Sequence, residues 1–213
     1  MNALGIIEVY SFTTAVCAAD IAAKAADVKV IAFDRTRPKS ADVPAPLVIA
    51  VKVEGDNSSV RAAIEAAKEY SEREGMYIVS HVISRPGEDM EKMAYLLDIN
   101  KDKYNKKLPK TFYGSTDPLP EPDFAIGLLE VSGLVASISG IDEMVKAADV
   151  HLIHTEKRLG GRLVTLVIKG KVSSVAAAVE AGAKAAAPLG ELHGKAVIAN
   201  PHGEIIKFFD YES

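Results

Sequence analysis

The side chains that could do chemistry in this chain are few: one cysteine and five histidines stand among 213 residues. Cys17 lies near the start of an expected helix, where the helix dipole could lower the pKa of the thiol and make it a nucleophile or a metal ligand. No histidine lies near it in the sequence to act as its base. The alternative is a small buried cysteine, and a single cysteine excludes an intrachain disulfide and a four-thiolate zinc site.

The histidines do not show the spacing of metal ligands. His151 and His154 lie three residues apart on an expected strand, whose alternation sends them to opposite faces, so they could share a metal only across a bulge. His81 and His193 are isolated strand residues, for which a structural role is the simpler interpretation. Gly160-Gly161 lacks the lysine and hydroxyl of a P-loop and the three-glycine spacing of a dinucleotide site. These residues form no catalytic constellation and so give no indication of an enzyme, and we expect no metal or cofactor.

Charge and hydropathy exclude further functions. The chain has 25 basic and 29 acidic residues, a formal net charge of −4, so no overall attraction draws it to nucleic acid or to an anionic membrane. No apolar stretch approaches the ~18 residues of a membrane span, and the N-terminus lacks the features of a signal peptide, so we expect a soluble, intracellular protein. Two loops depart from the acidic average, because residues 34–47 and 156–162 each carry three basic side chains. A solvated turn is the alternative interpretation for either loop alone.

The chain contains an internal repeat. Residues 24–28 (KAADV) recur as residues 146–150, an offset of 122, and beyond residue 50 the offset drops to 115, at which Gly55 matches Gly170. The excess of seven residues in the first copy falls within the first basic loop, at residues 34–47. Colinear matches along most of both copies indicate two related domains.

Each copy is expected to fold as β-α-β-β-α-β. The expected strands are residues 3–9, 28–33, 48–53 and 76–83 in the first copy and 125–131, 150–154, 163–168 and 192–199 in the second. Apolar side chains at helical spacing predict a helix after the first strand of each copy: Phe12, Val16, Ala19 and Ala23 share one face, as do Leu134, Ile138, Ile141 and Val145. A second helix is expected after the third strand, and two helices per four strands give the α+β class, as two tandem ferredoxin-like domains.

The copies are joined by a polar segment. Residues 88–97 predict a short helix, and the charged and proline-rich residues that follow predict a stiff, irregular connector. We expect a first domain at residues 1–97, the connector at 98–123 and a second domain at 124–213.

Several short motifs recur in both copies. Gly-Ile-Ile-Glu at residues 5–8 and Gly-Leu-Leu-Glu at 127–130 open them, and Asp-x-x-x-Lys-Ala-Ala follows at 20–26 and 142–148. Arg85-Pro86 ends the fourth strand of the first copy. In this combination the chain resembles the bacterial microcompartment shell proteins, specifically their tandem-domain members with unpermuted strand order.

The resemblance implies a structural protein in the bacterial cytoplasm: a homotrimer whose pseudohexagonal tiles pack edge to edge with other shell proteins. In this family the lysine of the repeated motif lies at the tile edge, here Lys24 and Lys146, with the arginine before the fourth-strand proline, here Arg85. Asn200 takes the arginine's place in the second copy.

The family's central pore is lined by the loop after the second strand. By position these residues are Arg35, Thr36, Arg37, Pro38, Lys39, Lys157, Arg158, Leu159, Gly160, Gly161 and Arg162. Six basic loops around one axis would concentrate small anions, so the resemblance predicts a pore for small anionic metabolites.

Two other interpretations stay open: a ferredoxin-like regulatory protein that binds a small molecule, and an electron-transfer shell protein that uses Cys17. Some tandem shell proteins hold an iron–sulfur cluster through a cysteine at the start of the first helix. Aligned on Asp20, that position is Ala15, and Cys17 lies two residues later, about 200° further around the helix.

Overall fold

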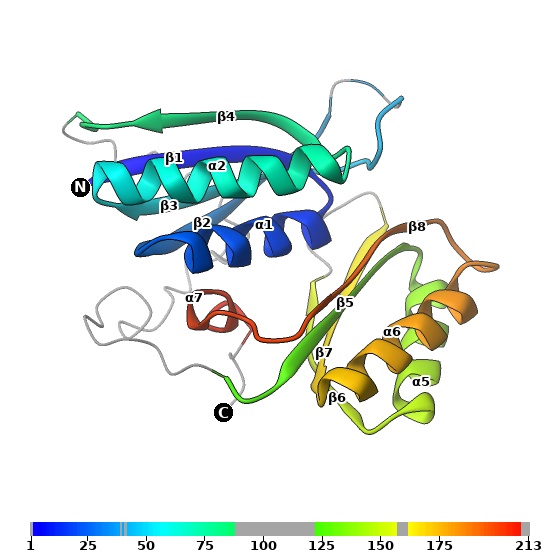
Figure 1. The fold of residues 1–213 in the computed structure, drawn as a ribbon. Coiled ribbons are helices and arrows are strands. Elements are labelled where there is room, and N and C mark those ends of the chain that lie inside the picture. Colours follow the sequence, from blue (N-terminus) through cyan, green and yellow to red (C-terminus); the bar gives the residue numbers. More distant parts are fainter. Residues whose placement is uncertain (1, 39, 41, 88–121, 157–161, 210–213) are drawn as a thin grey trace, which may run out of the picture.

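A computed structural model describes residues 2–38, 40, 42–87, 122–156 and 162–209. The helix predicted at residues 88–97, most of the predicted connector and most of the second basic loop lie outside these residues. The described residues form two four-stranded antiparallel sheets, one from each copy of the repeat, and each sheet carries its own helices (Figure 1).

The first half has the predicted order of elements. It contains β1 (Ala3–Tyr10), α1 (Phe12–Ala25), β2 (Val28–Thr36), β3 (Val48–Gly55), α2 (Asn57–Arg73) and β4 (Tyr77–Ile83). The strands lie in the order β2-β3-β1-β4, so β1 pairs with both β3 and β4 in the centre of the sheet.

The second half repeats this arrangement. It contains β5 (Ala125–Ser132), α5 (Leu134–Ala147), β6 (Val150–Glu156), β7 (Leu163–Gly170), α6 (Val172–Ala186) and β8 (Leu192–Ile198), in the strand order β6-β7-β5-β8. A one-turn helix, α7 (Gly203–Ile206), follows and was not predicted from the sequence. The α+β fold with two tandem β-α-β-β-α-β units is confirmed.

The two halves agree in small irregularities. The pairing of β1 with β4 shifts register between Glu8 and Val9, and that of β5 with β8 shifts between Glu130 and Val131. Gly5 is needed because a Cβ there would lie 2.6 Å from a side-chain carbon of Ile64 in α2, and Gly127 is in the same position against α6. Residues related by the offsets 122 and 115 are therefore structurally equivalent, and we call them counterparts.

The two halves share a hydrophobic core. One cluster of buried side chains contains most of the first half's core together with residues of β5, β7, β8 and the segment after β8. Helix α1 packs against β8, α7 and β5, so the second half covers it. A separate cluster fills the second half between its sheet and its helices. Among the described residues, none of the helices is long and apolar enough to cross a membrane.

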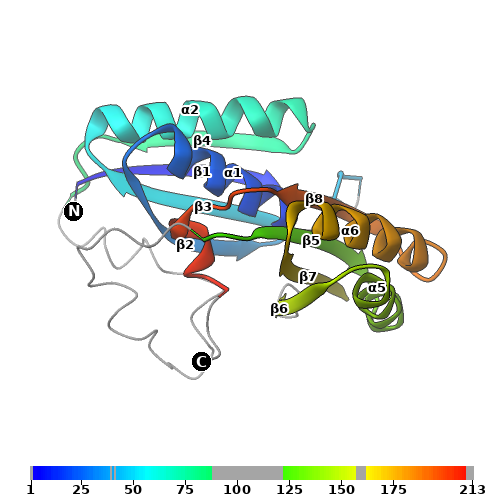
Figure 2. The same ribbon diagram turned by 60° about the horizontal axis from the view of Figure 1, so that its bottom comes forward.

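Helix α5 forms where it was predicted, but its apolar face is not buried as such a face usually is. Its buried residues are small or flexible: Ala136, Ser137, Gly140 and Met144. They allow close packing on α6, since a Cβ on Gly182 would lie 3.0 Å from the carbonyl oxygen of Gly140. In both views α5 lies on the side of the second half that faces away from the first half (Figure 1 and Figure 2).

Candidate assembly interface

The start of α1 is capped by a carboxylate from the second half. The first N–H groups of a helix have no acceptor within the helix itself. Glu130 in β5 accepts the hydroxyl of Ser11 at 2.6 Å, the N–H of Thr13 at 2.9 Å and the N–H of Phe12 at 3.3 Å. Glu130 is fully buried, so its negative charge is stabilised by these donors and by the positive end of the helix dipole.

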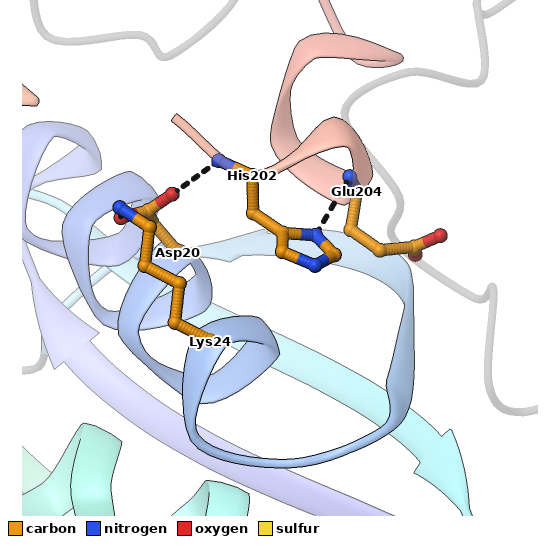
Figure 3. Close-up of polar contacts among 4 residues, drawn as sticks. All are labelled: Asp20, Lys24, His202 and Glu204. Carbon is orange, nitrogen blue, oxygen red and sulfur yellow. Dashed lines mark hydrogen bonds and ion pairs between the residues drawn. The ribbon is translucent and has the colours of Figure 1, made fainter. Parts of the chain in front are cut away.

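Further along, α1 contacts the segment after β8 (Figure 3). The buried carboxylate of Asp20 accepts the N–H of His202 at 2.7 Å and pairs with Lys24 at 2.5 Å. The N–H of Glu204 donates to His202 Nδ1 at 3.1 Å, and the carboxylate of Glu204 accepts the N–H of Val30 in β2 at 2.7 Å. These contacts fix α7 to the first half.

Aromatic side chains close the junction behind α7. The ring of Phe208 packs edge to face on Phe33 at a centroid distance of 4.8 Å, and Phe33 packs in the same way on Phe12 at 5.8 Å. All three rings are buried. Lys207 forms an ion pair with Glu204, yet burial lowers the pKa of the lysine. The halves are therefore joined by a continuous core of aromatic and aliphatic side chains rather than by a loose domain contact.

The equivalent surface of the second half is uncovered. Five apolar side chains on it are between 44% and 69% exposed: Leu134, Val135, Ile138, Val145 and Leu152. Their counterparts in the first half are at most 6% exposed: Phe12, Thr13, Val16, Ala23 and Val30. We call these five residues of the second half the α5 patch. A contiguous apolar surface of this kind indicates an interaction site.

Glu8, the counterpart of Glu130, lacks the contacts that Glu130 makes. Its side chain is half-buried and has no hydrogen-bond or ion-pair partner within the described part of the chain. Helix α5 begins after Gly133 without a side-chain cap, and no acceptor for the N–H of Leu134 or Val135 lies among the described residues. Among the described residues, Glu8 and the start of α5 therefore lack the contacts that their counterparts, Glu130 and the start of α1, make with each other.

Five of the predicted pore-lining residues are described: Arg35, Thr36, Arg37, Pro38 and Arg162. The other six lie outside the described residues: Lys39, Lys157, Arg158, Leu159, Gly160 and Gly161. All three described arginines are exposed.

The ends of the two basic loops are attached to the starts of the helices. The N–H of Ser11 donates to the carbonyl oxygen of Leu47 at 3.1 Å, and the N–H of Gly133 donates to that of Arg162 at 2.8 Å. Ser11 and Gly133 both have a positive φ, 70° and 103°, which turns the chain sharply from strand into helix. Each basic loop is therefore hydrogen-bonded at its end to the residue that precedes α1 or α5.

The predicted edge residues have different surroundings. The side chain of Lys24 is 40% exposed and is tied through Asp20 to the junction. The side chain of Lys146 is 61% exposed and pairs with Asp142, whose hydrogen bond raises the pKa of the lysine. Arg85 follows β4 and is exposed. Lys146 and Arg85 are thus available at the surface, whereas Lys24 also supports the contact between the halves.

Cys17 and the histidines do not form a reactive site in the described residues. Cys17 is 7% exposed, and burial raises the pKa of its thiol to about 11 although Tyr70 hydrogen-bonds to it. A neutral thiol is the opposite of the activated thiolate considered above. Strand β6 does contain a bulge between Leu152 and His154, but no three metal-ligating side chains converge in the described ranges.

The junction itself was not predicted from the sequence. Glu130, His202 and Glu204 can be recognised as junction residues only in the folded structure, where each contacts the first half. A signal was present in the differences between the copies: Ser11 and Thr13 at the start of one helix are replaced by Gly133 and Val135 in the other. Duplicated elements that differ at their starts are expected to meet different partners.

Comparisons with known proteins agree with this architecture. The family model of the BMC domain matches the chain twice, at residues 3–86 and 125–201. The carboxysome assembly protein CcmO of Synechococcus elongatus is 30% identical over 205 residues, which are 96% of this chain and 67% of CcmO. The bacterial microcompartment shell protein EutM of Salmonella typhimurium is 46% identical over 85 residues, which are 40% of this chain and 88% of EutM.

A crystal structure of a microcompartment protein from Desulfitobacterium hafniense DCB is 22% identical, covers 97% of this chain and 99% of its own, and has a TM-score of 0.37. The two matches of the family model span most of the chain, and the alignment with CcmO runs through both copies. CcmO is a carboxysome assembly protein, and EutM is a bacterial microcompartment shell protein. The chain therefore belongs to the BMC-domain family of bacterial microcompartment shell proteins, as a member with two tandem copies of the domain.

Proposed function

We propose that this shell protein acts as a homotrimeric tile with a basic central pore for small anionic metabolites. The observation that carries this proposal is that the α5 patch is exposed and that no side chain of the described residues caps α5. The equivalent surface on α1 is covered by the second half of the same chain. A second copy that offers its first half to α5 would repeat the junction already present within one chain.

Such a contact is head to tail, since the second half of one copy meets the first half of the next. Contacts of this type generate either closed rings or open filaments. EutM aligns over a single copy of the domain along 88% of its length. This chain has two copies of the domain, so a ring of three chains contains six domains. The domain limits 1–97 and 124–213 belong to the same proposal.

The basic loops support the pore. Exposed Arg35 lies near the end of β2, and exposed Arg37 and Arg162 lie in the basic loops, whose ends are attached to the starts of α1 and α5. If every copy brings both loops to one axis, positive charge surrounds a narrow opening. Such a ring raises the local concentration of anions and repels cations.

Edge-to-edge packing with other shell proteins is the second part of the proposal. Lys146 and Arg85 are exposed and would lie at the edges of the tile, and Lys24 would contribute there while it pairs with Asp20. Lys146→Glu is the cleaner test because Lys146 makes no contact with the first half within the described residues. We expect trimers of this variant to remain folded but to lose ordered layers in electron micrographs.

The oligomeric state and the pore can be measured directly. Light scattering of purified protein should give three times the 22.7 kDa of one chain. In assembled shells, Arg35→Glu with Arg37→Glu should slow the passage of a small anion and speed that of a cation of equal size. A monomer at all concentrations contradicts the tile, and equal permeation of both ions before and after substitution contradicts the pore.

A further inference from the structure

We propose that Glu8 and Val79 of one copy contact the start of α5, residues 133–135, of a second copy. In the junction within one chain the helix start carries Ser11 and the strand carries Gly194, whereas in the junction between copies the helix start carries Gly133 and the strand carries Val79. This exchange prevents either partner from taking the other's place. This inference rests on the proposed trimer and identifies the contacts that order its domains. It is carried by strand register and by the space at the helix starts.

Strand register fixes which residues are equivalent. Glu130 in β5 lies opposite Gly194 in β8, and Glu8 in β1 lies opposite Val79 in β4. Each glutamate thus lies beside one residue of the edge strand. In the second half that neighbour has no side chain, whereas in the first half it is a valine that is 50% exposed.

Within the chain, Gly194 lies directly on the start of α1. A Cβ on Gly194 would lie 2.9 Å from Thr13 Cβ, closer than real Cβ atoms approach, and 3.2 Å from Ser11 Oγ, which is a tight contact. Only glycine fits there, because the helix start supplies the side chains that fill the space.

At the start of α5 the arrangement is reversed. Ser11 is replaced by Gly133, so this helix start offers no side chain at its first position. Val79 has the side chain that Gly194 lacks, and Val135 offers it an apolar surface that is 69% exposed. Glu8 would then accept the N–H groups of Leu134 and Val135, as Glu130 accepts those of Phe12 and Thr13.

The exchange also disfavours the wrong pairings. If the first half of another copy approached α1, Val79 would occupy the space of Ser11 and Thr13, where even a single Cβ is too close. If a second half approached α5, Gly194 would face Gly133, and neither residue would supply a side chain to the contact. Specificity arises from such penalties on the wrong partner as much as from contacts with the right one. First and second halves must therefore alternate around the ring.

The test compares the oligomeric state of three single variants by light scattering over a dilution series. Val79→Asp places a charge against Val135, and Glu8→Gln replaces the acceptor carboxylate by an amide. We expect each to weaken trimer formation by about tenfold or more, while circular dichroism shows an unchanged fold. Val172→Asp is the matched control: Val172 is 48% exposed, and its counterpart Asn57 is not covered by the second half.

A crosslinking experiment tests position rather than affinity. Val79→Cys with Val135→Cys in one chain should give covalent dimers and trimers on oxidation, whereas either single substitution should give none, because Cys17 is buried. If the wild type is a trimer but these variants neither dissociate nor crosslink, the assigned contacts are wrong and the trimer stands. A monomeric wild type overturns both.

Discussion

The starts of α1 and α5 are the same structural element in two environments. At α1, a buried carboxylate accepts two backbone N–H groups and a serine hydroxyl, and the side chains of the helix are almost fully covered. At α5 no side chain of the described residues caps the helix, and Leu134 and Val135 are 62% and 69% exposed. Since both helices follow equivalent strands, the difference comes from what covers them and not from how they fold.

In the proposed trimer, each chain holds one complete junction within itself and contributes to a second junction with another copy. The completed junction is permanent because both sides belong to one chain, so folding alone brings Glu130 to α1. The second junction of the proposed trimer would depend on concentration, because its two sides would come from different copies. Substitutions at equivalent residues should therefore affect folding in one case and assembly in the other.

The largest effect is expected for the two glutamates. Glu130→Ala removes the acceptor of three donors in a buried site, which should lower the free energy of unfolding by about 3 kcal/mol or more. Glu8→Ala removes a side chain without partners in the described part of the chain, so the free energy of unfolding of the monomer should change by less than about 0.5 kcal/mol.

Urea unfolding measured at several protein concentrations separates the two effects. For Glu8→Ala the loss should vanish on dilution, because only assembly is weakened, whereas for Glu130→Ala it should persist. Equal losses at all concentrations would contradict the assignment of the two glutamates to different junctions.

A smaller effect is expected where Gly194 lies on α1. Gly194→Ala brings a Cβ within 2.9 Å of Thr13 Cβ and should cost about 1–3 kcal/mol of stability. In a Thr13→Gly background most of that cost should disappear, so a double-mutant cycle should give a coupling energy of about 1 kcal/mol.

The control is Gly87→Ala, because a Cβ on Gly87 would meet nothing within 4 Å. A strictly additive cycle would mean that Gly194 is free to move away from the helix. The junction would then be looser than its distances indicate.

The repeat made the fold predictable, and its limits explain what was not. The strands at residues 48–53 and 163–168, which the structure extends to β3 and β7, were predicted because β-branched residues are frequent in them and a glycine ends each one. Periodicity predicted α5. It could not reveal that Leu134 and Ile138 are exposed, since an apolar face shows that something covers a helix but not which chain supplies it.

The candidate site was predictable only in part. The basic loops and the lysines of the repeated motif were visible in composition and spacing, and their roles remain predictions. The capping role of Glu130 was not visible, because its donors lie more than a hundred residues away in the sequence. The short α7 was missed because a single turn has no measurable period, although His202 and Glu204 attach it to the first half.

The smallest expected effect is a loss of stability at alkaline pH that comes from Cys17 in the covered helix α1 and has no equivalent in α5. Burial raises the pKa of Cys17 from 9.0 to about 11, so the folded protein keeps a proton that the unfolded chain releases. The stability contributed by this thiol is complete below pH 9 and is lost as the pH rises through 11, about 1 kcal/mol of it by pH 10.

The counterpart in α5 is Ser139, which does not titrate, so Cys17→Ser copies the uncovered helix. Because burial also raises the pKa of Tyr70, the measurement is the difference in urea stability between wild type and variant. That difference should shift by this amount against the wild type between about pH 8 and pH 10, and a constant difference would mean that the thiol is open to solvent.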